Sequence, residues 1–449
     1  MGFKLKGLLM HPEKNSFSSE DKKFMNIAYT LAEKGRGTTC PNPMVGAVIV
    51  KDGKIISSGY HKMSGTPHAE INAINAVKSI PEGSKIYVTL EPCSFHGKTP
   101  PCTEALIKHK FSEVIISTID PNPKVHGQGV ALLEKAGIAV KTGLMEEKTK
   151  KQNEVFFTHI TQKRPFICVK IASTLDGKLA AFTGDSKWIT GTASRNMVQN
   201  IRFNYGCILT GINTVIKDDP LLFPRKDISR KFNLETVQDL NNIMISKKIV
   251  FKNESDETVN SIYEYSNFFR VVLDSNLKLD LESGIVKTAK FIRTILFVSE
   301  EAMQSKKNSG RARKLISLGI ELAAVKKSEN SPGITSSVKN MHENPKSASK
   351  VKNTAAKLDL KEVLNYLYLK HDIASILIEA GPTLVTSFLC ENLIDKFLIF
   401  LAPKIIGGDS RYNMFSGLGI ASMFDALNLK FSKIQKIGPD LMVEAYPLN

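Results

Sequence analysis

Apolar residues in the first third of the chain fall into short β-branched runs that alternate with helical repeats. The runs predict strands at 45–50, 55–60, 85–90, 114–118 and 138–140. The repeats predict helices at about 19–34, 68–80, 103–110 and 129–136. Because strands alternate with helices, this part of the chain is expected to form a layered α/β sheet.

The alternation resumes after the polar stretch 161–165. It predicts strands at 166–171, 207–210, 270–274, 294–298, 375–379 and 396–400. Two polar tracts, about 226–267 and 306–357, interrupt the pattern, and both are far longer than an ordinary connection between elements. We therefore expect an N-terminal extension (1–18), a first domain (19–163) and a second domain (164–449) that carries both tracts as insertions.

Composition and charge narrow the class of protein. The chain has 449 residues, of which 42% are hydrophobic, and no apolar run is long enough to cross a membrane or to form the core of a signal peptide. We expect a cytoplasmic protein without a membrane partner. Nearly half of the formal charge of +17 lies between Glu301 and Leu358, in a segment without the interleaved aromatic residues that stack on bases. Nucleic acid is therefore not an expected partner.

A candidate catalytic centre lies between residues 67 and 102. His68, Cys93 and Cys102 offer three ligands and leave one corner of a zinc tetrahedron for water, while Glu70 can move protons. Taken singly, His68 would be an ordinary capping or surface residue, and the cysteines would be buried apolar side chains. All four occur in the required order on the expected elements. We therefore expect one Zn²⁺ per chain and a hydrolytic deamination.

The spacing of the two cysteines distinguishes this site from the usual Cys-x-x-Cys of nucleoside deaminases. Eight residues separate Cys93 from Cys102. With this spacing, the segments 40–46, 89–92, 97–101 and 120–123 resemble the deaminase half of the bifunctional riboflavin-biosynthesis deaminase/reductase family. The resemblance implies a cytidine-deaminase-like three-layer α/β/α domain. It also implies that the substrate is a small molecule, a diaminopyrimidinone that carries a phosphoribosylamino group.

By the same resemblance, Asn42 would hydrogen-bond the pyrimidine and Lys98 would meet the phosphate. A solvated lysine is the alternative for Lys98. The chain departs from the family at Phe95, a position where the family commonly has histidine. Because Phe95 cannot hydrogen-bond, either His96 replaces that histidine or the substrate contacts there are weaker.

The second domain has no Gly-x-Gly-x-x-Gly after a strand, but Glu379–Thr383 ends an apolar run and opens a helix whose free amides can bind an anion. The segments 170–178, 186–190, 218–222 and 379–383 are similar to the reductase half of the same family. The resemblance implies a dihydrofolate-reductase-like α/β domain that uses NADPH to reduce the ribosyl group to ribityl.

The resemblance also assigns residues in this domain. Those that would line the cofactor are Ala172, Trp188, Thr214, Asp218, Ser275, Gly381, Pro382, Thr383, Leu384, Val385, Thr386 and Ser387. Those that would face the substrate are Ser186, Arg202, Leu222, Arg225 and Glu379. The planar forks of Arg202 and Arg225 suit a phosphate, and Lys170 and Glu379 are candidates for proton transfer. For Trp188, core packing is the alternative.

The expected function is a two-step conversion in riboflavin biosynthesis, a zinc-dependent deamination followed by an NADPH-dependent reduction, by an enzyme that we expect to be a homo-oligomer. Two other interpretations remain open. A nucleic-acid base deaminase with an appended module is disfavoured by the cysteine spacing and by the reductase-like segments. A basic binding protein with a structural zinc is disfavoured by Glu70 and by the lack of a fourth ligand.

Overall fold

The computed structural model describes residues 16–96, 100–224, 268–328, 357–408, 412–418 and 420–448. The chain divides into two compact units, Met1–Gln162 and Lys163–Asn449, and the division falls within the polar stretch 161–165. Lys98, Arg225 and the first polar tract lie outside the described residues. Within the described ranges, no helix is long and apolar enough to cross a membrane.

The first unit contains a five-stranded sheet in the order β2-β1-β3-β4-β5. Its strands are β1 (Gly46–Lys51), β2 (Lys54–Tyr60), β3 (Lys85–Leu90), β4 (Glu113–Thr118) and β5 (Ala139–Thr142). β1 is antiparallel to β2 and β3, whereas β3, β4 and β5 are parallel. The start of β1 and the ends of β2, β3 and β4 therefore meet at one edge of the sheet.

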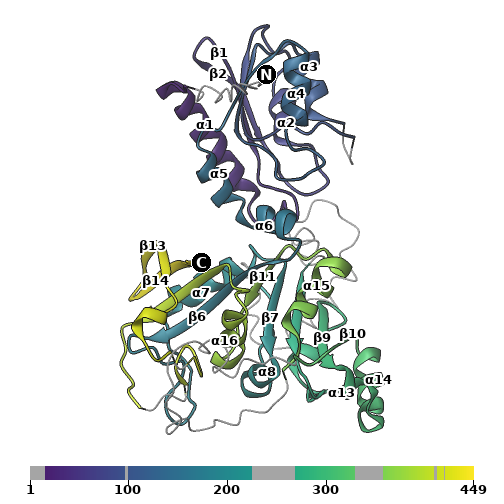
Figure 1. Ribbon diagram of the computed structural model, residues 1–449, viewed down its shortest axis with the longest axis vertical. Helices are drawn as coiled ribbons and strands as arrows, with labels where there is room; N and C mark the ends of the chain where they lie inside the picture. Colours follow the sequence, from purple (N-terminus) through teal and green to yellow (C-terminus); the bar gives the residue numbers. More distant parts are fainter. Residues whose placement is uncertain are drawn as a thin grey trace, which may run out of the picture. The chain divides into compact units, whose positions relative to one another are not determined.

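Helices cover both faces of this sheet (Figure 1). The helices of the unit are α1 (Ser19–Ala32), η1 (Glu33–Gly35), α2 (Ala69–Asn75), α3 (Cys102–Lys108), α4 (Gln128–Lys135), α5 (Glu146–Gln152) and α6 (Glu154–Gln162). Side chains alternate along β1, so Ala47 and Ile49 pack with α2, α3 and α4, while Val48 and Val50 pack with α1. Burial on both faces explains why the strands read as continuous apolar runs.

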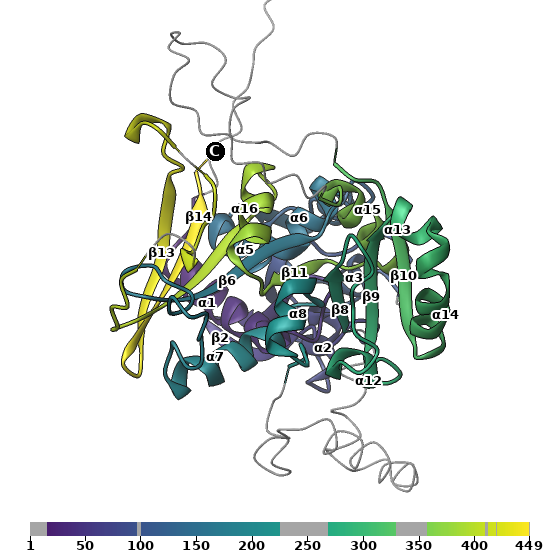
Figure 2. The same ribbon diagram turned by 90° about the horizontal axis from the view of Figure 1, so that it is seen from below.

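The second unit contains a nine-stranded sheet in the order β10-β9-β8-β7-β11-β6-β12-β14-β13 (Figure 2). Its strands are β6 (Phe166–Thr174), β7 (Cys207–Gly211), β8 (Phe269–Leu273), β9 (Arg293–Ser299), β10 (Ile320–Val325), β11 (Ser375–Ile378), β12 (Lys396–Ala402), β13 (Leu429–Ile437) and β14 (Asp440–Pro447). The strands from β10 to β12 in this order run parallel, and the β13–β14 hairpin joins β12 in antiparallel fashion. The carboxyl ends of β8, β7, β11 and β6 thus lie side by side, which is where such sheets bind ligands.

The second unit also contains helices, and several of them pack on its sheet. They are α7 (Thr192–Arg202), α8 (Ile212–Asp218), α12 (Gly284–Lys287), α13 (Glu300–Gln304), η2 (Lys306–Asn308), α14 (Ser309–Ser317), α15 (Leu360–His371), α16 (Pro382–Cys390) and η4 (Met423–Asp425). The apolar sides of α15 and α16 form the main core with alternate residues of the parallel strands, and this core includes Val363, Leu367 and Phe388.

Arg270 on β8 is fully buried and belongs to the other side of the sheet, where alternation places it away from that core. Its guanidinium donates to the carbonyl oxygens of Leu221 and Ile285, at 3.0 Å each. It also donates to the hydroxyls of Thr288 and Thr294, at 2.7 Å each. Burial lowers the pKa of Arg270 to about 9. Arg270 therefore anchors the backbone at Leu221, which follows α8, to the sheet.

The expected start of the second insertion is wrong. Residues 306–325 form η2, α14 and β10, and β10 pairs in parallel with β9. Only Ala312 and Leu315 of α14 are buried, so this helix reads as polar although it packs on the sheet. Residues 329–356 of that tract lie outside the described part of the chain.

Candidate active sites

The three expected zinc ligands converge at the carboxyl edge of β3 in the first unit. His68 precedes α2, Cys93 follows β3, and Cys102 begins α3. Nδ1 of His68 lies 3.5 Å from Sγ of Cys93 and 3.4 Å from Sγ of Cys102. Their three ligand atoms lie within 4.8 Å of one another, and within the described ranges this is the group of side chains spaced to hold a metal ion.

These distances fit tetrahedral zinc. With Zn–N near 2.0 Å and Zn–S near 2.3 Å, tetrahedral angles place a nitrogen and a sulfur ligand about 3.5 Å apart. The observed separations of 3.4 and 3.5 Å match this value. Because both sulfurs face Nδ1 of His68, Nδ1 is the ring nitrogen that would bind the metal. Three donors leave one corner of the tetrahedron for water, as in catalytic zinc sites.

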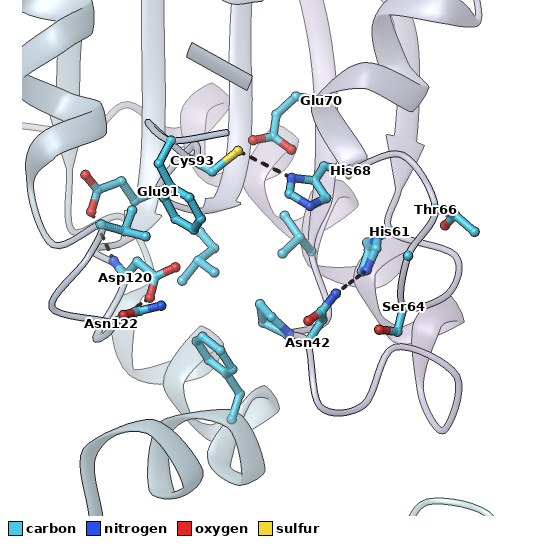
Figure 3. Close-up of a pocket in the computed structure, with 17 residues that line it drawn as sticks. Asn42, His61, Ser64, Thr66, His68, Glu70, Glu91, Cys93, Asp120 and Asn122 are labelled. Carbon is cyan, nitrogen blue, oxygen red and sulfur yellow. Dashed lines mark hydrogen bonds between the residues drawn. The ribbon is translucent and has the colours of Figure 1, made fainter. Parts of the chain in front are cut away.

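Glu70 lies in the first turn of α2 beside these ligands (Figure 3) and is 3% exposed. In the metal-free protein, burial and the nearby charge of Cys93 raise the pKa of Glu70 to about 7. A hydrogen bond from Cys102, with support from His68, lowers the pKa of Cys93 to about 4. The same bond, together with burial, raises the pKa of the Cys102 thiol. A buried carboxyl group beside the ligand atoms is placed to accept a proton and to return it.

A cavity of ≈ 320 Å³ opens beside the ligands, a volume that suits a small molecule. Figure 3 shows the labelled side chains of its two walls, Asn42, His61, Ser64 and Thr66 on one side and Glu91, Asp120 and Asn122 on the other. His68, Glu70 and Cys93 lie together at one end of the cavity. Asn42 therefore lines the same cavity as His68, Glu70 and Cys93.

Phe95 lines the same cavity, and 42% of this residue is exposed. His96 turns elsewhere: its Nε2 lies 3.2 Å from Oε1 of Glu104, and 70% of its side chain is exposed. His96 therefore does not take the place of the family's histidine at the cavity. An apolar ring occupies that part of the wall.

Sequence reasoning missed His61, Asp120 and Asn122 as site residues. His61 follows β2 and the other two follow β4, so all three sit at the edge where these strands end. Nε2 of His61 lies 3.4 Å from Nδ2 of Asn42. Burial is the main cause that raises the pKa of Asp120 to about 6. The signal available in the sequence was a polar residue shortly after a predicted strand. This signal indicates a site residue only when the order of the strands in the sheet is known.

Asn153, between α5 and α6, fixes the backbone near Asn42. Its Oδ1 accepts a hydrogen bond from the Met44 amide at 2.8 Å, and its Nδ2 donates to the Met44 carbonyl at 3.0 Å. Asn153 is 2% exposed. Asn153→Ala is expected to lower the free energy of unfolding by about 2–4 kcal/mol, because it leaves a buried donor and a buried acceptor unpaired.

Urea denaturation of the two variants Asn153→Ala and Asn26→Ala measures this effect. Asn26 lies on the exposed side of α1, so its replacement is expected to cost about 0.5 kcal/mol or less. Equal losses in both variants would show that the paired bonds to Met44 add nothing.

In the second unit, Glu379 is buried at the carboxyl end of β11. Its Oε2 lies 3.0 Å from Nζ of Lys170. Arg202 donates to both of its oxygens, from Nε at 2.6 Å and from Nη2 at 3.1 Å. Burial alone would raise the pKa of Glu379, but the charges of Arg202 and Lys170 hold that pKa well below its usual range.

These contacts differ from two expectations. The planar fork of Arg202 holds the carboxylate of Glu379, in place of the substrate phosphate expected from the sequence. Its remaining nitrogen, Nη1, donates to the carbonyl oxygen of Phe223 at 3.2 Å. Because Glu379 stays ionised at neutral pH, it has no proton to donate, and Lys170 is the better of the two candidates for proton transfer.

Several elements that carry residues expected at the cofactor begin at the carboxyl edge of the second sheet. Val169 on β6 pairs with Ile378, the last residue of β11. Ala172 lies three residues further toward the carboxyl end of β6. Thr214 and Asp218 lie in α8 after β7, and Ser275 follows β8. The segment 381–387 forms the cap and the first turns of α16, whose free N-terminal amides can bind a phosphate.

Trp188 lies between β6 and α7, and 65% of this residue is exposed. The guanidinium of Arg195 lies 4.4 Å from the centre of its ring. Core packing, the alternative role for Trp188, is therefore wrong. Of the residues expected to face the substrate, Ser186 in the same loop is partly buried, and Leu222 is 3% exposed with a positive φ of 47°.

Two families match the chain. The family described as "RibD C-terminal domain" matches residues 165–443. The family described as "Cytidine and deoxycytidylate deaminase zinc-binding region" matches residues 18–118, a range that contains the three zinc-ligand candidates and Glu70.

The similarity to known relatives and to solved structures extends over nearly the whole chain. The "Riboflavin biosynthesis protein RibD" of Aquifex aeolicus is 35% identical over 423 residues, which cover 94% of this chain and 97% of that protein. The Escherichia coli protein of the same name is 33% identical over 428 residues, which cover 94% and 98%. The structure of Acinetobacter baumannii RibD matches with a TM-score of 0.73 and 31% identity, and covers 96% of this chain and 99% of its own. A diaminohydroxyphosphoribosylaminopyrimidine deaminase/5-amino-6-(5-phosphoribosylamino)uracil reductase of Thermotoga maritima matches with a TM-score of 0.70 and 33% identity over the same shares.

Proposed function

The chain belongs to the RibD family of riboflavin-biosynthesis enzymes, and on that premise we propose how its two units divide the work. The protein is bifunctional, with a zinc-site deaminase in the first unit and a reductase in the second. The first unit removes an amino group from a diaminopyrimidinone that carries a phosphoribosylamino group. The second unit then reduces the ribosyl group of the product to ribityl.

The observation that carries the deaminase half is the convergence of Nδ1 of His68 and two cysteine sulfurs beside a buried carboxyl group. His68, Cys93 and Cys102 would hold one zinc ion, and zinc bound there would supply a nucleophilic hydroxide at neutral pH by lowering the pKa of a water molecule to about 7. Glu70 is the group that would accept a proton during the attack of water and return it to the leaving amine. Asn42 orients the pyrimidine from the cavity wall, and Lys98 meets the phosphate.

The reductase half rests on the residues gathered at the carboxyl edge of the second sheet. Ala172, Ser275 and the start of α16 would hold NADPH, which would supply the hydride, and the free N-terminal amides of α16 suit a phosphate. Trp188, Thr214 and Asp218 complete the cofactor site. Glu379 orients Lys170 and Arg202, and Lys170 handles the proton that accompanies hydride transfer. Ser186, Leu222 and Arg225 face the substrate.

A two-step turnover assay tests this function. The purified protein is given the diaminopyrimidinone phosphate with and without NADPH, and ammonia and NADPH are followed separately. We expect one ammonia and one NADPH per substrate when both are present, and ammonia alone when NADPH is withheld. Metal analysis should find about one zinc per chain, and less in the variant Cys102→Ser. Absence of both ammonia release and NADPH oxidation would refute the assignment.

A further inference from the structure

We propose that Glu91 is a positioning residue for the deaminase. Its side chain connects one wall of the substrate cavity to the segment after β3 that contains the candidate zinc ligand Cys93. This inference rests on the proposed deaminase function and adds a residue to it. Glu91 comes directly after β3, two residues before Cys93, and it is 4% exposed. It lines the cavity together with Asp120 and Asn122 (Figure 3).

Both carboxylate oxygens of Glu91 accept hydrogen bonds from backbone amides of one distant segment. Oε2 accepts from the amides of Asp120 at 3.2 Å and Gly127 at 2.9 Å. Oε1 accepts from the amides of Gly129 at 2.9 Å and Val130 at 3.3 Å. One side chain thus holds both ends of the loop that connects β4 to α4. In the same contact, it supplies the negative charge that the N-terminus of α4 favours.

The bonding pattern requires a carboxylate. Each oxygen of Glu91 faces two N–H groups, so all four partners are donors and neither oxygen has room for a proton of its own. A glutamine would have the same shape but would place its NH₂ group against two N–H donors. Glu91→Gln therefore keeps the volume and removes about half of the bonds.

Packing around Gly129 supports the same role. A Cβ atom built on Gly129 would lie 2.2 Å from the carbonyl oxygen of Pro92 and 3.1 Å from Oε1 of Glu91. The first turn of α4 can therefore approach the chain beside Cys93 only because this residue has no side chain. Gly129→Ala would push α4 away from Glu91 while the carboxylate itself is retained.

Asp120 connects the hydrogen bonds of Glu91 to the cavity. Its amide is held by Glu91, and its Oδ1 accepts a hydrogen bond from the amide of Asn122 at 2.8 Å. Both side chains line the cavity. If the bonds of Glu91 are lost, the distance between this wall and Cys93 is no longer fixed. A substrate bound against the wall is then no longer held at the correct position relative to the zinc site.

The test compares steady-state kinetics and zinc content of the full-length protein with those of Glu91→Gln and Gly129→Ala. We expect kcat/KM for ammonia release to fall by about 10–100-fold in both variants, mostly through KM, while zinc stays near one per chain. NADPH oxidation with the deaminated product as substrate should be unchanged. The matched control is Glu113→Gln, since Glu113 is a paired carboxylate on β4 of the same sheet, bound to Lys85 and Lys141 and not part of the cavity lining.

A residue that only stabilises the fold would give a different result. Lower thermal stability of Glu91→Gln with an unchanged KM would overturn the proposal, as would an equal rise of KM in Glu113→Gln. If Glu91→Gln does not fold, Gly129→Ala decides: an unchanged KM in that variant overturns the proposal. A wild-type protein that releases no ammonia would instead refute the deaminase function itself, so the two failures can be told apart.

Discussion

Replacing Glu70 by glutamine is expected to lower the deaminase kcat by about 10²–10⁴-fold while the protein keeps its zinc. Glutamine preserves the size and most of the packing of this residue, which is 3% exposed at the start of α2. It cannot accept a proton from water or return one to the leaving amine. The three metal ligands are untouched, so the loss would fall on proton transfer and not on metal binding.

Ammonia release measures the loss, and metal analysis of the same preparation measures the zinc. Glu104→Gln is a suitable control, because Glu104 lies on α3 two residues from Cys102 but its side chain is 61% exposed. Its deaminase activity should equal that of the wild type, and NADPH oxidation with the deaminated product should be normal in both variants. Deamination by Glu70→Gln at more than about a tenth of the wild-type rate would exclude Glu70 as the proton carrier.

The convergence of His68, Cys93 and Cys102 was predictable from sequence because each residue follows a local signal. His68 stands at a helix start, Cys93 stands after a buried strand, and the segment 67–102 contains all of the parts. The three donors then lie within 4.8 Å of one another, as a single metal requires. The β/α alternation was equally readable, since buried strands form continuous apolar runs. The resemblance to a bifunctional family, drawn from spaced motifs, is confirmed by relatives that cover the length of the chain.

Contacts between distant segments were not predictable in the same way. Glu91 meets the amides of 120–130 only because β3 and β4 are parallel neighbours, and no local pattern specifies that order. Arg202 was expected at a phosphate because its fork fits paired oxygens, but a carboxylate offers the same pair, and Glu379 takes it. The β13–β14 hairpin was missed because the alternation that begins β13 is interrupted by a β-bulge between Phe431 and Lys433.

Replacing Glu379 by glutamine is expected to lower NADPH-dependent reduction by about 10²-fold or more, because Lys170 and Arg202 lose the group that orients them. It should also lower the free energy of unfolding of the second unit by about 3–5 kcal/mol, since two buried cations lose their shared carboxylate. Ammonia release by the first unit should be unaffected. Single-turnover reduction of the deaminated substrate and urea denaturation measure the two effects.

The loss of stability caused by Glu379→Gln should become smaller at acid pH. The pKa of Glu379 is lowered in the folded protein, whereas in the unfolded chain it is about 4.3. The ionised carboxylate therefore gives its full stabilisation above about pH 4.3, and this is lost as the pH falls through the folded pKa. The stability difference between wild type and Glu379→Gln should be constant from about pH 7 to pH 5 and should shrink below about pH 4. The control is Glu282→Gln, since Glu282 is 80% exposed in its ion pair with Lys287 and its loss should cost about 1 kcal/mol or less. A difference that grows as the pH falls would show that Glu379 is protonated in the folded protein, contrary to its position between two cations.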